Sequence, residues 1–524
     1  MTTLQLSDTH SVMTTSVTPP ESAAGAALMR AREAVGQRYV KAALQTGVGG
    51  VASRVLGGLA PIILARYLGP DKYGVYTLIV SLVGIFAGVA HLGQNTALQK
   101  FLPEYFVKDP ARGGMILADT IVIVSGILAV ACTAFYLLSG WMAATIYRQA
   151  SLAPLFRFSA LLVLFLSLFN LASSAVAGLQ DFASYSKAMV IRSAGFLALA
   201  WAGVALLGLY GALGGQVLAA ILGLGFLLAA GARAARRRFS GMVRTAFSRS
   251  ILAEIFSFAF PAFLSGALVA PAFWWANTLL ARDSGFAQVG LFGVAFALAQ
   301  LILVVPTSLT IPAVSFFSEA YASSQCGQGD PFGKLVNTNL RLIWAIALPL
   351  ALASALFAPW IVNLFFGPAY REAAVLASVM SFVALLMVIN HVIGNSIAGS
   401  GRMWQGFAVN SFWAALFFTT GSLLIPRWGP TGLAFTFAFS YLIFTFGVWI
   451  YTRIALHLNY ERITLLAILT LTSVALTAFD ARIGDTPVRC AVAILLLLAL
   501  VATEYRWTLD HRERTLLRRA WPWS

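Results

Sequence analysis

The sequence predicts an all-α integral membrane protein with about fourteen transmembrane helices. Hydrophobic residues make up 59% of the 524 residues and charged residues only 10%, against roughly 25% charged in soluble domains. The apolar runs are continuous over about 20 residues, which is the length that crosses a bilayer core of about 30 Å. Strands of an outer-membrane barrel would instead alternate polar and apolar residues. Similar segments also recur in the two halves of the chain, as many transporters show.

The apolar spans are joined by short connections that Gly or Pro often punctuates. They lie near 43–65, 73–97, 116–138, 155–178, 189–208, 211–231, 255–280, 288–317, 339–365, 373–399, 405–425, 430–451, 463–479 and 488–503. Most of the 35 Lys and Arg residues lie in the tails and the even-numbered connections. By the positive-inside rule, both termini are therefore expected in the cytoplasm. The last two spans are short, and whether both cross the membrane is left open.

An internal repeat divides the chain. The segment LARYLGPDKYGVY (64–76) is echoed 216 positions later as LARDSGFAQVGLF (280–292). SAVAGLQD at 174–181 recurs as NSIAGSGR at 395–402, and YGALGG at 210–215 recurs as WGPTGL at 428–433, with offsets of 221 and 218. Six helices return the chain to the same side of the membrane. We therefore expect two parallel six-helix repeats, related by an axis along the membrane normal, plus two extra C-terminal helices.

The apolar spans and their connections divide the chain into six predicted segments. The positive charge is expected mainly in the connections and tails, outside the helices. The segments are a disordered cytoplasmic tail (1–38), an N-terminal six-helix bundle (39–232), a basic cytoplasmic linker (233–250), a C-terminal six-helix bundle (251–453), helices 13 and 14 (454–504) and a cytoplasmic tail (505–524). We interpret the arginines of the linker as a topology determinant that touches anionic headgroups. No folded domain surrounds them, so the net charge of +16 does not indicate nucleic-acid binding. The three cysteines show no metal-site spacing.

Arg54 is the outstanding candidate site residue. It lies near the middle of the first span, where a charge costs a few kcal/mol and should face a watery cavity or a partner. Acids at matching depth are scarce, because Asp119 and Glu254 lie near span ends and Glu319 lies at the end of span eight. We favour a cavity-facing role over a structural ion pair. The equivalent position in the second half is Ala270, so the site is expected to be asymmetric.

Uncharged polar residues form further candidates. His91, Gln94 and Asn95 have the i, i+3, i+4 spacing that places side chains on one helical face. Such a face can hydrogen-bond a sugar or an ion, or it can join helices to one another, and the sequence leaves both alternatives open. The same ambiguity applies to Asn277, Gln300, Asn390, His391 and Asn395.

The charges inside or close to the spans are mostly positive. Arg54, Arg157, Arg192 and Arg341 outnumber the acids at similar depth. A cavity of that sign favours an anionic substrate, because the guanidinium fork pairs with phosphate. An exporter of cationic drugs would be expected to keep a deep carboxylate, and none is evident in spans one or seven. We expect no cofactor and no metal, and coupling to a Na⁺ or H⁺ gradient is left open.

The stretch from 43 to 105 resembles the polysaccharide-biosynthesis transporters. In particular, ARYLGPDKYGVY and HLGQNTALQKFLPEY look like the first loop and second-span signature of that family. Its members are the O-antigen and exopolysaccharide flippases of the multidrug/oligosaccharidyl-lipid/polysaccharide (MOP) superfamily. The resemblance implies a V-shaped pair of six-helix bundles and alternating access. It also implies a substrate, an undecaprenyl-pyrophosphate-linked oligosaccharide, and a place in the bacterial inner membrane.

The expected function is therefore a lipid-linked oligosaccharide flippase. Arg54, helped by Arg192, would hold the pyrophosphate, and polar groups of spans two, seven and eight would meet the sugars. Those groups are His91, Gln94, Asn95, Asn277 and Gln300. Membrane lipids are expected partners, polysaccharide polymerase or export machinery is a candidate partner, and nucleic acid is not expected.

Three alternatives remain beside this expectation. Two are other MOP transporters, namely a drug or metabolite antiporter and a peptidoglycan lipid-precursor flippase. The third is a membrane enzyme such as a polysaccharide polymerase or ligase. It is disfavoured because the longest outward connection, 139–154, carries no carboxylate to build a catalytic platform.

Overall fold

The structure is a computed structural model that describes residues 21–239, 266–309, 330–460, 463–480 and 486–503, with single positions between 245 and 264 and between 313 and 324. Within these ranges the chain is helical and has no strand, as the sequence predicts. Eight of the described helices are long and apolar enough to cross a membrane. The molecule is thus an all-α, multi-pass membrane protein.

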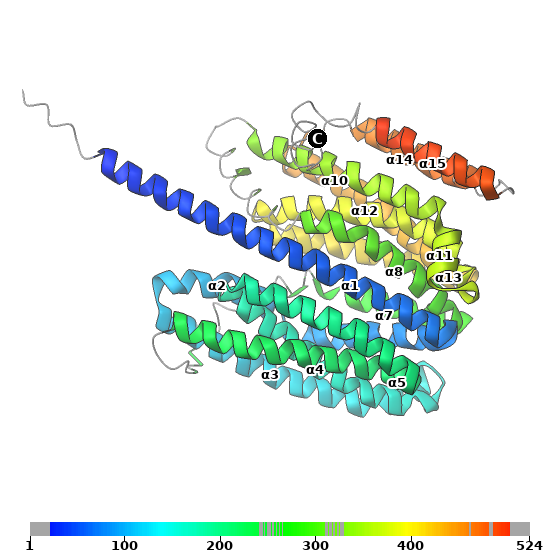
Figure 1. Cartoon of the computed structure of the whole chain (residues 1–524), viewed down its shortest axis with the longest axis horizontal. Helices are drawn as coiled ribbons and strands as arrows, with labels where there is room; N and C mark the ends of the chain where they lie inside the picture. The colour runs from blue at the N-terminus through cyan, green and yellow to red at the C-terminus, as the bar shows by residue number, and fades with distance from the viewer. Residues whose placement is uncertain are drawn as a thin grey trace, which may run out of the picture.

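The helices fall into two groups: α2 to α5 lie on one side of α1, and α8, α10, α12 and α13 lie on the other (Figure 1). The first group contains α1 (Glu21–His91), α2 (Gln94–Lys108), α3 (Pro110–Trp141), α4 (Ala153–Gly178) and α5 (Phe182–Arg238). The second contains α7 (Val269–Ser284), α8 (Phe286–Leu309), α10 (Pro331–Leu356), α11 (Ala358–Phe365), α12 (Ala373–Gly399) and α13 (Met403–Ala455). Helices α14 (Ile463–Asp480) and α15 (Thr486–Thr503) lie outside the second group, against α10.

The first helix begins earlier than the sequence predicts. Residues 21–38 fall within the segment expected to be a disordered tail, and they belong to α1. Their alanine-rich sequence has high helix propensity, which explains the difference. Residues 1–20 lie outside the described part of the chain.

Three of the long helices are interrupted at a glycine. The interruptions are at Gly69 in α1 (φ 70°, ψ 171°), Gly208 in α5 (φ 57°, ψ −128°) and Gly429 in α13 (φ 54°, ψ −130°). These angles are accessible almost only to glycine. A straight helix of the length of α5 would extend about 85 Å, far beyond a bilayer core of about 30 Å. Instead the backbones of Gly203 and Gly211 touch, so α5 folds back on itself as a helical hairpin.

The two halves use the same backbone conformation at matching positions. Gly69 and Gly285 belong to the repeated segments that begin at 64 and 280, and their angles are nearly equal, since Gly285 has φ 92° and ψ 167°. Gly208 and Gly429 also match, at the same offset as the segments that begin at 174 and 395. The sequence motifs at the hairpin predict an offset of 218, which pairs Gly211 with Gly429. The backbone angles instead give an offset of 221. Gly208, and not Gly211, is the structural counterpart of Gly429.

A helix start is repeated as well. The Asp109 carboxylate accepts hydrogen bonds from the backbone N–H groups of Ala111 and Arg112, and α3 then begins with proline. Asp330, at the corresponding position of the second half, caps α10 through Gly333 N–H, and α10 also begins with proline. Aspartate at the cap and proline in the first turn are a favourable start for a helix. The repeat is therefore visible in capping as well as in kinks.

Helices α1 and α8 cross at a pair of glycines. A Cβ atom on Gly74 would lie 1.8 Å from the Phe286 carbonyl oxygen, and one on Gly290 would lie 2.1 Å from the Pro70 carbonyl oxygen. Gly74 and Gly290 are themselves counterparts, because each is the eleventh position of its copy of the repeated segment that begins with LAR. Small residues allow helices to approach this closely within a membrane. The two halves are therefore in backbone contact at this crossing.

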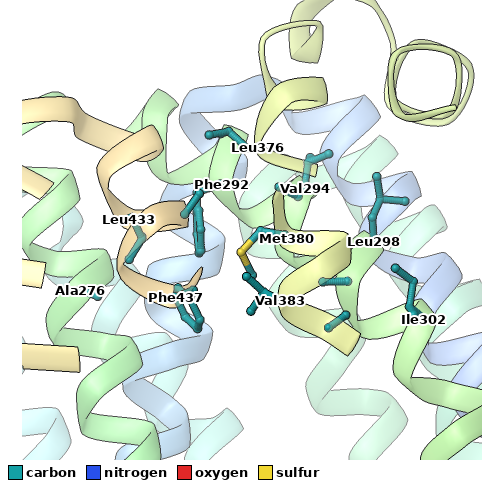
Figure 2. Close-up of a cluster of buried hydrophobic side chains, with 14 of the residues drawn as sticks. Ala276, Phe292, Val294, Leu298, Ile302, Leu376, Met380, Val383, Leu433 and Phe437 are labelled. Carbon is teal, nitrogen blue, oxygen red and sulfur yellow. The ribbon is translucent and has the colours of Figure 1, made fainter. Parts of the chain in front are cut away.

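The core of the second half fixes the orientation of α8 (Figure 2). The buried side chains of Val294, Leu298 and Ile302 recur every four residues and form one face of α8, beside the buried residues of α12. Phe292, on another face, stacks on Phe437 of α13 with ring centroids 5.6 Å apart. The Phe292 face of α8 thus packs on α13 and also borders the cavity between the halves, while the Val294 face belongs to the core.

Candidate functional site

A cavity of about 1200 Å³ lies between the two halves. Helices α1 and α5 of the first half and α7, α8 and α12 of the second half line it. Pockets for small molecules usually have volumes of about 300–1,000 Å³. This cavity therefore has room for the head of a large ligand.

Arg54 extends from α1 into this cavity. Its side chain is exposed, and its Nη1 donates a hydrogen bond of 2.6 Å to Thr307 Oγ1 on α8. The Thr307 hydroxyl in turn donates to the Leu303 carbonyl oxygen at 2.6 Å, which fixes its orientation. Gly57 and Gly58 line the same wall and present no side chain there. The Arg54 guanidinium thus links the two halves and borders open space.

Arg192 is the second cation of the lining. It comes from α5, and its guanidinium carbon lies 5.1 Å from the centre of the Phe169 ring, within range of a cation–π interaction. Arg54 and Arg192 line the same cavity, so the two cations share one region. Among the described residues that line the cavity, there is no aspartate or glutamate.

The second-half wall of the cavity is polar but carries no arginine or lysine among the described lining residues. The polar residues there are Asn277 of α7, Gln300 and Thr307 of α8, and His391 and Asn395 of α12. Ala270, the repeat counterpart of Arg54, lines this wall too. The structure thus brings together Arg54, Arg192, Asn277 and Gln300 from the predicted set, with His391 and Asn395 beside them.

His91, Gln94 and Asn95 do not share a helical face. Helix α1 ends at His91 and α2 begins at Gln94, because Leu92 (φ 42°) and Gly93 (φ 74°) adopt left-handed backbone conformations. The expected i, i+3, i+4 face is therefore wrong. The side chains of His91 and Gln94 are buried and do not line the cavity. The Asn95 side chain lies outside the described residues, and a role in substrate binding for these three stays a prediction.

The other two basic residues named from the sequence lie elsewhere. Arg157 is exposed, with its guanidinium carbon 5.8 Å from the centre of the Tyr136 ring. Arg341 is buried in α10, where its Nη2 donates to Thr338 Oγ1 at 3.4 Å. Neither lines the cavity.

Sequence reasoning also missed Thr307, because a single threonine in an apolar helix gives no signal of its partner on another helix. Glu254 and Glu319 lie outside the described residues.

A family model described as polysaccharide biosynthesis protein matches residues 63–375, more than half of the chain. The chain belongs to this family. It is 26% identical over 408 residues to the EPS I polysaccharide export inner membrane protein EpsE of Ralstonia solanacearum, covering 75% of this chain and 89% of EpsE. It is also 32% identical over 113 residues to an uncharacterized membrane protein, MJ1068, of Methanocaldococcus jannaschii, covering 21% and 22% of the two chains.

Solved structures of MOP transporters share the fold of this family member. The lipid II flippase MurJ in its inward closed conformation superposes with a TM-score of 0.68 at 13% identity, covering 88% of this chain and 99% of MurJ. An inward-facing multidrug resistance MATE family transporter superposes with a TM-score of 0.64 at 16% identity, covering 79% and 95%. With this family and this fold, the chain is a membrane transporter of polysaccharide biosynthesis and not an enzyme.

Proposed function

We propose that this protein is a flippase that moves an undecaprenyl-pyrophosphate-linked oligosaccharide across the bacterial inner membrane for exopolysaccharide or O-antigen synthesis. The observation that carries the proposal is the large cavity between the halves, with Arg54 and Arg192 on its wall and no acidic group among its described lining residues. Arginine pairs with phosphate through two parallel hydrogen bonds. Membership of the polysaccharide biosynthesis family and the likeness to EpsE support a polysaccharide precursor as cargo.

In the proposed mechanism, Arg54 and Arg192 hold the pyrophosphate while Asn277 and Gln300 hydrogen-bond the sugars. The prenyl chain stays in the lipid at a gap between the halves. Rocking of one half against the other then exposes the head group on the far side of the membrane. The Gly74–Gly290 crossing is a point where the halves touch, so the rocking takes place at or around this contact.

The proposed topology has fourteen crossings. Each of the helices that are interrupted at Gly69, Gly208 and Gly429 supplies two of them. Six crossings per half make the halves parallel, and both termini then lie in the cytoplasm. The similar backbone angles at Gly69 and Gly285 support a repeat of this kind. Cysteine labelling of the linker (233–250) from one side of the membrane tests the orientation.

A drug antiporter shares the fold but fits the cavity less well. A cationic drug would meet two arginines and no described carboxylate on the lining, and like charges in a cavity repel. Drug sensitivity of a deletion strain that still exports polymer would favour this alternative.

The function is tested by polymer export in a deletion strain that carries the Arg54→Ala variant. We expect polymer export to be lost while the variant remains folded in the membrane, as measured by its yield and thermal stability. Wild-type protein in liposomes should also expose a fluorescent undecaprenyl-pyrophosphate oligosaccharide on the opposite leaflet. Normal export by Arg54→Ala would contradict the site. Failure of the wild-type protein to move the lipid would contradict the function.

A further inference from the structure

A second cavity of about 370 Å³ opens beside the main one, between α8, α12 and α13. It shares Leu303, Thr307 and His391 with the main cavity. We call it the side pocket, and its polar lining consists of Thr307, Asn390, His391, Asn410 and Tyr441. Its volume lies within the range of about 300–1,000 Å³ that is usual for small-molecule sites.

The side pocket differs from the main cavity in charge. Of its described lining residues, none is Arg, Lys, Asp or Glu. A phosphate or a uronate carboxylate would therefore find no guanidinium or ammonium group of the described lining there to compensate for its loss of water. A wholly apolar group such as a prenyl chain would leave Asn390 Oδ1 and the Tyr441 hydroxyl group, which bond no described residue, without partners, and this costs about 1–3 kcal/mol for each. The lining suits a ligand that is uncharged and polar.

The polar groups of the side pocket are held in place by the protein. Asn390 Nδ2 donates to the Leu386 carbonyl oxygen at 2.8 Å and to Thr445 Oγ1 at 2.6 Å. Its amide oxygen, Oδ1, is buried and accepts no hydrogen bond from the described residues. A ligand hydroxyl group that reached this oxygen would supply the hydrogen bond that the protein does not.

Tyr441 offers both a ring and a hydroxyl group. Its ring stacks on Phe437, with centroids 6.4 Å apart and an interplanar angle of 6°, and it packs edge-on against Phe444. The side chain is partly exposed, and its hydroxyl group has no hydrogen bond to any residue that the structure describes. Phe444 also lines the side pocket. A sugar matches this combination, because it has hydroxyl groups at its rim and apolar C–H groups on its faces.

The side pocket begins beside Arg54. Thr307 lines both cavities, and its hydroxyl accepts the hydrogen bond from Arg54 Nη1. A phosphate held by Arg54 therefore lies at the entrance of the side pocket. The group attached to that phosphate can enter it without leaving the cation.

We propose that the side pocket binds the uncharged glycosyl residue that is attached directly to the diphosphate held by Arg54. The proposal rests on the proposed function, since it divides the same substrate between two neighbouring sites. The cationic cavity takes the diphosphate, and Asn390 and Tyr441 select a neutral sugar at the position next to it.

The experiment compares two kinds of lipid on the purified full-length protein in detergent. One is undecaprenyl diphosphate, and the other is the same lipid carrying one hexose, with glucose, galactose and N-acetylglucosamine as separate probes. The dissociation constant of each is measured by isothermal titration calorimetry. Wild-type protein should bind at least one glycosylated lipid more tightly than the unglycosylated one. Tyr441→Phe and Asn390→Ala should each reduce that preference roughly 2- to 10-fold, as expected for one lost hydrogen bond, and should leave the affinity for undecaprenyl diphosphate unchanged.

Controls separate the proposal from a folding defect and from the proposed function. Tyr441→Phe removes a hydroxyl group that bonds no described residue, so its thermal stability should equal that of the wild type. Ser411→Ala, on α13 outside both cavities, removes a hydroxyl group that donates to the Phe407 carbonyl oxygen and should not alter the preference. If wild-type protein binds neither lipid, the proposed function fails. If wild-type protein binds the glycosylated and unglycosylated lipids with equal affinity, only the side-pocket proposal fails. The same conclusion follows if Tyr441→Phe weakens the binding of all these lipids by the same factor.

Discussion

The two halves of the molecule agree in backbone and disagree in chemistry. Gly69 and Gly285 share one conformation, and Gly208 and Gly429 share another. The residues of the cavity wall do not show the same agreement between the halves. Arg54 and its counterpart Ala270 both line the cavity, yet only one of them carries a charge. The difference teaches that the repeat determines how the halves fold and meet, while single positions within it determine what the cavity binds.

The largest expected effect comes from removing the charge that distinguishes the halves. Arg54→Ala should weaken undecaprenyl diphosphate binding roughly 10- to 150-fold, because hydrogen bonds to a charged group contribute about 1.5–3 kcal/mol. Calorimetric titration measures this loss. Arg157→Ala removes the same charge from an exposed position outside the cavity and serves as the matched control. The Arg54→Ala/Ala270→Arg double variant moves the charge to the other half and should not recover binding, since the hydrogen bond to Thr307 holds a cation at position 54. Recovery would mean that the asymmetry is unimportant.

The next largest effect is expected at the helix crossing to which each half contributes one glycine. Gly74→Ala and Gly290→Ala each place a methyl group against the backbone of the other half. Overpacking of this kind costs about 1–3 kcal/mol, so the transport rate in liposomes should fall roughly 5- to 100-fold in each variant. The two losses should be similar, because the two positions are equivalent. Gly88→Ala, at a position with open space beside it, is the control. Clearly unequal losses of transport rate would show that Gly74 and Gly290 do not contribute equally to the crossing.

A smaller effect is expected at Arg192. Its guanidinium already interacts with the Phe169 ring, and its Nε is buried. Part of its charge is thus engaged within the first half. Arg192→Ala should weaken diphosphate binding about 3- to 10-fold, which corresponds to roughly 0.6–1.4 kcal/mol. A loss as large as that of Arg54→Ala, in the same titration, would mean that the two cations hold the ligand equally.

The smallest effect is expected from removing the hydrogen bond between Arg54 and Thr307, which joins the two halves. Thr307→Val keeps the shape of the side chain and removes the hydroxyl group that accepts from Arg54 Nη1. The cation stays in the cavity but loses its fixed position, so diphosphate affinity should fall about threefold, within the range of one hydrogen bond. Thr77→Val, also on the lining, removes a hydroxyl group that donates to the Tyr73 carbonyl oxygen within α1 and provides the comparison. An unchanged affinity for Thr307→Val would show that Arg54 needs no positioning.

The sequence predicts the all-α membrane fold, because long apolar runs have few other solutions in a bilayer. It also singles out Arg54, since a charge inside an apolar span is costly wherever it lies. It did not predict the interruption at Leu92 and Gly93, because one glycine is tolerated within a helix and leucine is a good helix former. It also missed the pairing of Thr307 with Arg54 and the side pocket. Both depend on contacts between helices that lie far apart along the chain.

The paired glycines also bear on how such a protein changes over evolutionary time. Between Gly290 and Asp330 the second half is longer than the first, since the offset between matching positions rises there from 216 to 221. The length of a copy has thus changed, whereas Gly74 and Gly290 still fit against one another. A methyl group at either glycine would press on a backbone carbonyl of the other half, which no side-chain substitution there can remove. Arg54 and Ala270 instead line an open cavity. Single substitutions on the cavity wall can therefore change what the cavity binds while the contact between the halves stays the same.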